Sequence, residues 1–248
     1  MVCSFAEMAV TKARIEKNLQ VIRERIGEAC SRAGRRQEEV RIVAITKQVD
    51  LETLKNLLEL GHSDIGESRV QQLAQRVEEI DSYLQRKRNT PPERPRWHLV
   101  GTLQRNKISA ALASADVIHS LDSLRLAEDV NARAERAGRR ADVLLQVNCS
   151  QEPQKHGVAV GAALHLAELV CTLEHVRLLG LMTMAPLAAD PERARPTFVR
   201  LRELFEEMCG AKIGAPNFRH LSMGMSQDYT VAVEEGATML RIGTALFE

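Results

Sequence analysis

The chain has 248 residues, of which 44% are hydrophobic and 27% charged, and its 34 basic and 33 acidic side chains leave a formal net charge of +1. This near balance argues against a dedicated nucleic-acid-binding protein, which needs clustered Lys and Arg side chains to contact phosphates. No apolar run approaches the ~20 residues of a membrane-spanning helix, so we expect no membrane association.

The first ten residues and the cysteines predict a cytoplasmic protein. The segment MVCSFAEMAV is short for a signal peptide and contains Glu7. Five cysteines are scattered through the chain without CxxC spacing, and HExxH is absent, so neither a disulfide framework nor a metal site is indicated. We expect a single domain spanning residues 1–248.

Short apolar or β-branched runs alternate with longer amphipathic stretches along the chain, which predicts strands alternating with helices. Several runs are almost continuously apolar, as in parallel strands that are covered on both faces. Eight strands are predicted, at residues 41–46, 62–65, 96–101, 116–121, 142–148, 176–184, 220–225 and 238–244.

The intervening stretches carry apolar residues at helical spacing. Helices are predicted at residues 51–60, 67–80, 104–113, 123–137, 159–173, 197–208 and 227–235. A further amphipathic segment, about residues 8–33, precedes the first strand. The chain ends four residues after the last strand, so we expect no helix there, and we expect residues 8–33 to fill the resulting gap.

Eight strands in strict alternation with helices predict a (β/α)8 TIM-type barrel with an extra N-terminal helix. An open, doubly wound sheet is the alternative, although the GxGxxG pattern it favours is missing after the first strand. The Arg- and Pro-rich segment at residues 85–94 is interpreted as a solvated loop on the face opposite the active site.

Functional side chains of such barrels gather where the strands end. Lys47 directly follows the first strand, where a lysine can attack a carbonyl carbon to form a Schiff base. An ordinary solvent-exposed lysine is the alternative interpretation.

The loops after the last two strands indicate an anion site, because this part of a barrel commonly binds phosphate. Gly224 and Gly243 permit close backbone approach, and Ser226 and Thr244 offer hydroxyl donors. Ser226 is predicted to cap the helix at 227–235. Turn-forming residues without a ligand are the alternative for either loop alone, but with Lys47 on the adjoining strand the set suits a phosphate ligand that carries a carbonyl.

Arg241 lies two residues before Gly243 and on the same side of the strand. Beside a pyridine ring it would keep the ring nitrogen unprotonated, because a guanidinium does not give up its proton. The alternative is a barrel-interior arginine paired with a carboxylate such as Glu67.

Together these residues resemble the pyridoxal-phosphate homeostasis protein family (YggS/PROSC type), related to the N-terminal barrel domain of alanine racemase. The resemblance covers nearly the whole chain, in a fixed order of short motifs. They are AITK at 44–47, IGES at 65–68, WHLVGTLQRNK at 97–107, VNCS at 147–150, KHG at 155–157, GLM at 180–182, LSMGMS at 221–226 and RIGTA at 241–245.

The resemblance implies a fold-type III pyridoxal 5′-phosphate barrel in which Lys47 holds the cofactor as a Schiff base. It implies that Ser226, Gly243 and Thr244 contact the phosphate and that Arg241 faces the pyridine nitrogen. It also implies that Asn148, Ser222 and Met223 line the barrel mouth. Trp97 and His98 are expected to be packing residues.

This chain departs from the family pattern after Lys47, where Gln48 and Val49 replace a second lysine and a proline, and at Ser68, which replaces an asparagine. None of these changes removes a predicted anchor. Lys155 remains as a second amine in the KHG motif.

The function implied is intracellular vitamin B6 homeostasis, with the cofactor held and released rather than used in turnover and with cofactor-dependent apoenzymes as recipients. The alternative is a fold-type III amino-acid racemase or decarboxylase. A two-base racemase needs an acid/base on each face of its substrate, and the chain has only Tyr83 and Tyr229 as tyrosines, with no evident opposing base. We expect a monomer with no catalytic residue.

Overall fold

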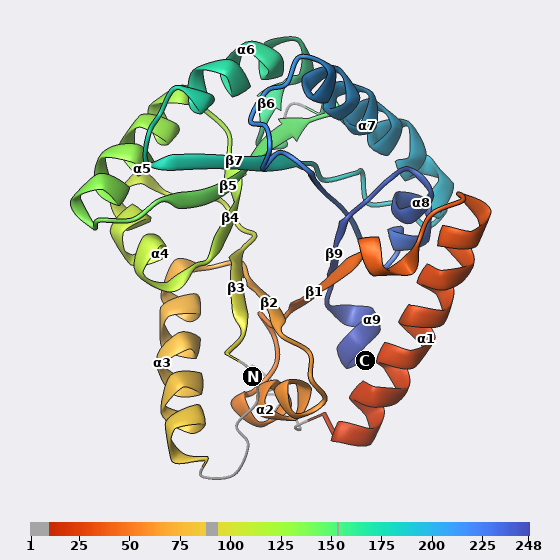
Figure 1. Ribbon diagram of the computed structural model, residues 1–248. Helices are drawn as coiled ribbons and strands as arrows, with labels where there is room; N and C mark the ends of the chain where they lie inside the picture. The colour runs from red at the N-terminus through yellow and green to blue at the C-terminus, as the bar shows by residue number, and fades with distance from the viewer. Residues whose placement is uncertain (1–9, 88–93, 153) are drawn as a thin grey trace, which may run out of the picture.

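The computed structural model describes residues 10–87, 94–152 and 154–248, and its strands form a closed ring (Figure 1). The strands pair in parallel, and the ring closes because β1 pairs with β9 and β4 with β5. The eight barrel strands are β1 (Arg41–Ile45), β2 (Asp64–Glu67), β3 (Arg96–Leu99), β4 (Val117–Leu121), β5 (Ala141–Asn148), β7 (Val176–Met182), β8 (His220–Met225) and β9 (Met239–Ile242). The predicted barrel is therefore confirmed, and the open sheet is excluded.

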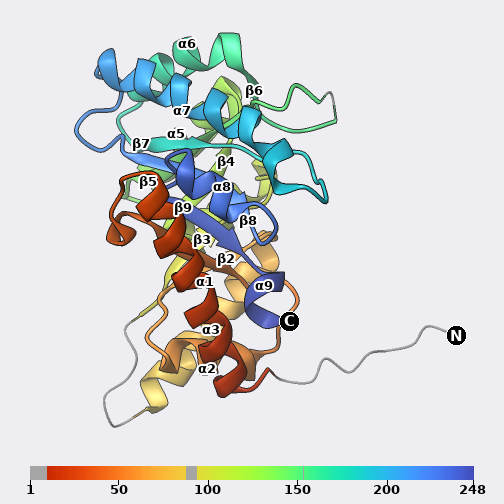
Figure 2. The ribbon, with the colours of Figure 1, turned by 90° about the vertical axis from the view of Figure 1, so that its right-hand side faces the viewer.

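A two-residue strand, β6 (Val158–Ala159), pairs with the end of β5 outside this ring. The helices surround the barrel, as Figures 1 and 2 show. They are α1 (Lys12–Arg32), α2 (Leu51–Glu59), α3 (Val70–Arg86), α4 (Ile108–Ser114), α5 (Leu124–Arg136), α6 (Val160–Cys171), α7 (Arg195–Gly210), α8 (Tyr229–Glu234) and α9 (Thr244–Phe247). Within the described ranges, no helix combines the length and apolar character needed to cross a membrane.

Helix α1 fills the position predicted for it, because it contacts α2, α8 and α9. Its side chains at helical spacing, Ile15, Leu19, Ile22 and Ile26, are buried. The expectation that no helix follows the last strand was wrong. Helix α9 makes one turn there, since burial of Leu246 and the hydrogen bond from Asn18 Nδ2 to its carbonyl (2.9 Å) stabilise so short a segment.

Some predicted boundaries also differ. The helix expected at 67–80 begins only at Val70, because Glu67 completes β2, and it continues to Arg86. The segment at 104–113 starts as a 3₁₀ turn, Arg105–Lys107, before α4. Of the loop expected at 85–94, residues 88–93 lie outside the described part of the chain.

Alternation along each strand divides the buried side chains into two layers. In β9, Leu240 and Ile242 belong to the large cluster between strands and helices, whereas Met239 belongs to a small cluster in the barrel interior. The interior cluster comprises Val43, Val117, Leu144, Met182 and Met239. Polar side chains that share this inward alternation can reach the centre of the barrel.

We expect the protein to lose stability as the pH falls from about 6.5 toward 4. Burial, with the charges of Arg219, Arg41 and Arg96 nearby, lowers the pKa of His220 to about 4, and burial also lowers the pKa values of His62 and His119. As the pH falls, the unfolded chain takes up protons that the folded chain does not. Each histidine therefore lowers the free energy of unfolding by at most about 1.4 kcal/mol per pH unit.

Urea unfolding between pH 7 and 4.5 measures this slope. His220→Gln should reduce this slope by the contribution of up to one proton. Equal slopes in the parent protein and the variant would contradict the assignment to His220.

Candidate functional site

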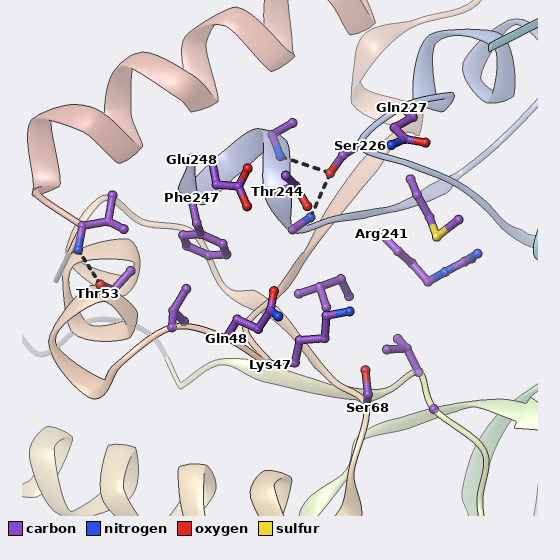
Figure 3. Close-up of a pocket in the computed structure, with 18 of the residues that line it drawn as sticks. Lys47, Gln48, Thr53, Ser68, Ser226, Gln227, Arg241, Thr244, Phe247 and Glu248 are labelled. Atoms are coloured by element: carbon purple, nitrogen blue, oxygen red, sulfur yellow. Dashed lines mark hydrogen bonds between the residues drawn. The ribbon is translucent and has the colours of Figure 1, made fainter. Parts of the chain in front are cut away.

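A cavity of about 760 Å³ opens where the barrel strands end. Its walls come from the segments that follow β1, β2, β3, β7, β8 and β9 and from the end of α9. Of the eight residues predicted for the site, the structure brings five to this cavity: Lys47, Ser226, Arg241, Gly243 and Thr244. Figure 3 labels all of them except Gly243.

The other three predicted residues are not part of the cavity wall. Met223 is buried in the cluster between strands and helices, since its side chain points to the opposite face of β8 from Ser222. Ser222 is also fully buried, inside the barrel. Asn148 is engaged in the loop after β5, where its Nδ2 donates to the carbonyl oxygens of Glu152 (3.0 Å) and Lys155 (3.4 Å).

Lys47 follows β1 and is exposed to the open cavity. Its backbone carbonyl accepts a hydrogen bond from Gln72 Nε2 (3.2 Å), which anchors the main chain at this point. Within the described part of the chain, its ammonium group has no hydrogen bond or ion pair. The Nζ atom is therefore accessible to a ligand.

Ser226 joins the loops after β8 and β9. Its Oγ accepts hydrogen bonds from the backbone N–H groups of Gly243 (3.3 Å) and Ala245 (3.1 Å), drawn as dashed lines in Figure 3. The predicted helix cap was wrong: α8 begins at Tyr229, and Asp228 occupies its capping position. The accepting oxygen leaves the Ser226 O–H free to donate, so this loop pair presents a hydroxyl donor to the cavity.

Arg241 is buried in the cavity wall, and its guanidinium bonds to neutral groups. Nη1 donates to Ser222 Oγ (2.7 Å) and Nη2 to the carbonyl of Thr183 (2.8 Å). Burial lowers its pKa to about 10, partly offset by the charge of Asp228. Among the described residues no salt bridge to Arg241 is formed, so the alternative interpretation, a pairing with Glu67, is not observed.

Glu67 instead accepts a hydrogen bond from Thr46 Oγ1 (2.5 Å), and burial raises the pKa of its carboxyl group. Asp228 also lies in the cavity wall. Its Oδ1 accepts the N–H of Met225 (2.6 Å), and burial raises its pKa as well. Of these two carboxyl groups, Asp228 is the one whose charge acts on Arg241.

Several residues of the wall were missed from the sequence. Ser68 and Gly101 lie at the ends of β2 and β3, so their position in the strand order was the signal that could have identified them. Phe247 is the last residue of α9, which was not predicted, and Glu248 follows it. The rim also includes Met184 and Leu187, whose side chains are exposed.

Residues 10–248 match the family model described as alanine racemase, N-terminal domain. A pyridoxal phosphate homeostasis protein of Aquifex aeolicus is 38% identical over 233 residues, which cover 93% of this chain and 96% of that protein. The structure of PipY of Synechococcus elongatus with PLP bound aligns with a TM-score of 0.75 at 31% identity, over 90% of this chain and all (100%) of that one.

The barrel is also similar to an alanine racemase of Clostridium difficile, with a TM-score of 0.70 at 14% identity, over 96% of this chain and 57% of that chain. At this identity the likeness concerns the fold. The rest of the racemase chain lies outside the matched region.

Proposed function

The chain belongs to the pyridoxal phosphate homeostasis protein family, and we propose that it holds pyridoxal 5′-phosphate through Lys47 and releases it without turning over a substrate. Binding of this cofactor is the property of the family, and a relative has been solved with it bound. The observation that carries the residue assignment is the convergence of Lys47, Arg241 and the Ser226 loop pair on one cavity.

The side chains present fit this cofactor. An accessible amine suits its aldehyde, and the hydroxyl groups of Ser226 and Thr244 suit its phosphate. Arg241 has five N–H donors, of which two are engaged by Ser222 and Thr183, so donors remain for a ring acceptor. The cofactor's role in such a site is to present an electrophilic carbonyl and an electron-withdrawing ring.

The residues have distinct roles in this proposal. Lys47 supplies the amine that condenses with the aldehyde, with loss of one water molecule, and addition of water reverses the bond and frees the ligand. Ser226 donates to the phosphate while its oxygen holds the two loops together. Arg241 keeps its proton and donates to the pyridine nitrogen, which weakens the ring as an electron sink and disfavours carbanion chemistry.

The cavity wall favours binding over turnover. Among the described lining residues there is no tyrosine, histidine or cysteine to act as an opposing base. Tyr83 bonds to Glu59 on the outer surface, and Tyr229 is buried in α8. Asp228, the buried carboxyl group in the wall, is engaged with the Met225 N–H.

Borohydride trapping tests this proposal. The protein mixed with pyridoxal 5′-phosphate should develop a visible absorbance band, and reduction followed by peptide mass mapping should place one adduct on the Lys47 peptide. Lys155→Ala is the matched control and should trap equally, since Lys155 is engaged with Glu152 and the Met184 carbonyl. An adduct spread over surface lysines would refute the site, and steady turnover of added amino acids would refute the carrier assignment.

Ser226→Ala should weaken pyridoxal 5′-phosphate binding about tenfold, the size of one lost hydrogen bond to a charged group. Pyridoxal, which lacks the phosphate, should bind the variant and the parent protein equally. Titration of the absorbance band with both ligands gives the two ratios. Equal losses for the two ligands would assign Ser226 a role in loop structure alone.

A further inference from the structure

A chain of hydrogen-bonded side chains crosses the barrel interior and ends at Arg241. Asp64 Oδ1 is 3.0 Å from His98 Nε2, His98 Nδ1 is 2.9 Å from His119 Nε2, and His119 Nδ1 is 2.9 Å from Ser222 Oγ. Arg241 Nη1 donates to the same Ser222 oxygen at 2.7 Å. The chain thus joins the start of β2, at one end of the barrel, to the cavity at the other.

These side chains come from strands β2, β3, β4, β8 and β9 and share the inward alternation described above. His98, His119 and Ser222 are completely buried. A buried polar atom without a partner costs about 1–3 kcal/mol, so the chain must satisfy each of its donors and acceptors.

Only one arrangement of the hydrogens along this chain of side chains satisfies every donor and acceptor. Asp64 Oδ1 lies 3.0 Å from His98 Nε2 and 4.0 Å from Arg41 Nη1, and the positive charge of Arg41 favours the ionised carboxylate, so Asp64 accepts. His98 Nε2 must then carry hydrogen, and its bare Nδ1 accepts from His119 Nε2–H. His119 Nδ1 in turn accepts from the Ser222 O–H, whose oxygen accepts from Arg241.

The alternatives leave defects. If His119 carried hydrogen on Nδ1 alone, two bare nitrogens would face each other at 2.9 Å. If both rings donated toward Ser222, the Ser222 oxygen would accept from His119 as well as from Arg241, and the Ser222 hydrogen would have lost His119 as its acceptor. His98 would then carry hydrogen on both nitrogens, which adds a second buried cation to the chain that ends at Arg241.

We propose that His119 and Ser222 are positioning residues, which hold the Arg241 fork in one orientation toward the ligand ring, and that Asp64 sets their tautomers from the far end of the barrel. Ser222 and the Thr183 carbonyl hold two nitrogens of the guanidinium and so define its plane. This inference rests on the proposed function only in taking a pyridine ring as the group that Arg241 faces.

Long-range ¹H–¹⁵N NMR of the cofactor-free protein tests the chain directly. His98 and His119 should both appear as Nε2–H tautomers at neutral pH. An Nδ1–H tautomer at either ring would overturn the assignment, whatever the protein binds.

His119→Gln and His119→Leu test the consequence for the ligand. A glutamine can donate to His98 and accept from Ser222, as the histidine does, so it should retain the parent's affinity for pyridoxal 5′-phosphate and its absorbance maximum. Leucine leaves the Ser222 O–H without its acceptor, so affinity should fall about tenfold and the maximum should shift.

Glyceraldehyde 3-phosphate, an aldehyde phosphate without a ring, separates positioning from general damage when its borohydride-trapped yield is compared. Its yield should be the same in the parent and both variants. Equal losses for both ligands, or equal behaviour of the two variants, would refute the positioning role. If the parent protein traps neither ligand on Lys47, the proposed function fails, and the NMR result still decides the tautomers.

Discussion

Replacement of Lys47 by alanine should abolish covalent capture of pyridoxal 5′-phosphate without disturbing the fold. The side chain is exposed, so its removal should change the free energy of unfolding by less than about 0.5 kcal/mol. The amine, in contrast, is required for the carbon–nitrogen bond, and no other described lysine lines the cavity. The visible band and the borohydride-trapped peptide should both disappear.

Lys47→Arg provides the matched control for charge. Arginine keeps the positive charge near the ligand but does not form the bond, so the ligand should still bind, noncovalently and more weakly, without the band. Equilibrium dialysis measures this residual binding. A trapped adduct in Lys47→Ala at the parent's yield would show that the attachment site lies elsewhere.

Gly101→Ala should disturb the cavity wall and lower the stability of the fold. A methyl group built at Gly101 would lie 2.0 Å from the backbone oxygen of Ser68 and 2.8 Å from its carbonyl carbon. Backbone atoms cannot yield as a flexible side chain does, so the loops after β2 and β3 must separate. We expect a loss of about 3 kcal/mol in unfolding free energy, together with weaker ligand binding, because both residues line the cavity.

Gly161→Ala is the control for this substitution. Gly161 lies in α6, where an added methyl group meets no atom within 4 Å, so the same change should stabilise the protein by about 0.5–1 kcal/mol. Urea unfolding of the two variants gives the comparison. A stability of Gly101→Ala equal to that of the parent would contradict the close approach of the two loops.

The sequence by itself determined the strand order and much of the cavity. Parallel strands covered on both faces must be apolar throughout, and this local requirement is legible in runs such as residues 142–148. Once the barrel is inferred, the residue after each strand belongs to one end of it. Lys47, Ser226 and Gly243 could therefore be grouped without coordinates.

Only the tertiary structure decided what each side chain contacts. The hydrogen bonds from the backbone N–H groups of Gly243 and Ala245 to Ser226 Oγ could not be predicted, because they depend on how two loops meet and not on the sequence of either loop. Met223 belongs to a motif at the barrel mouth, yet the alternation along β8 turns its side chain toward the helices. His98 was expected only to pack, since no local pattern reveals its partners.

His98 bonds to Asp64, which lies 34 positions earlier in the chain, and to His119, 21 positions later; His119 in turn bonds to Ser222, 103 positions further on. Local periodicity indicates which face of an element is apolar, because that pattern lies within a few consecutive residues. It does not report which buried polar groups meet, because closure of the barrel brings together strands that are distant in sequence.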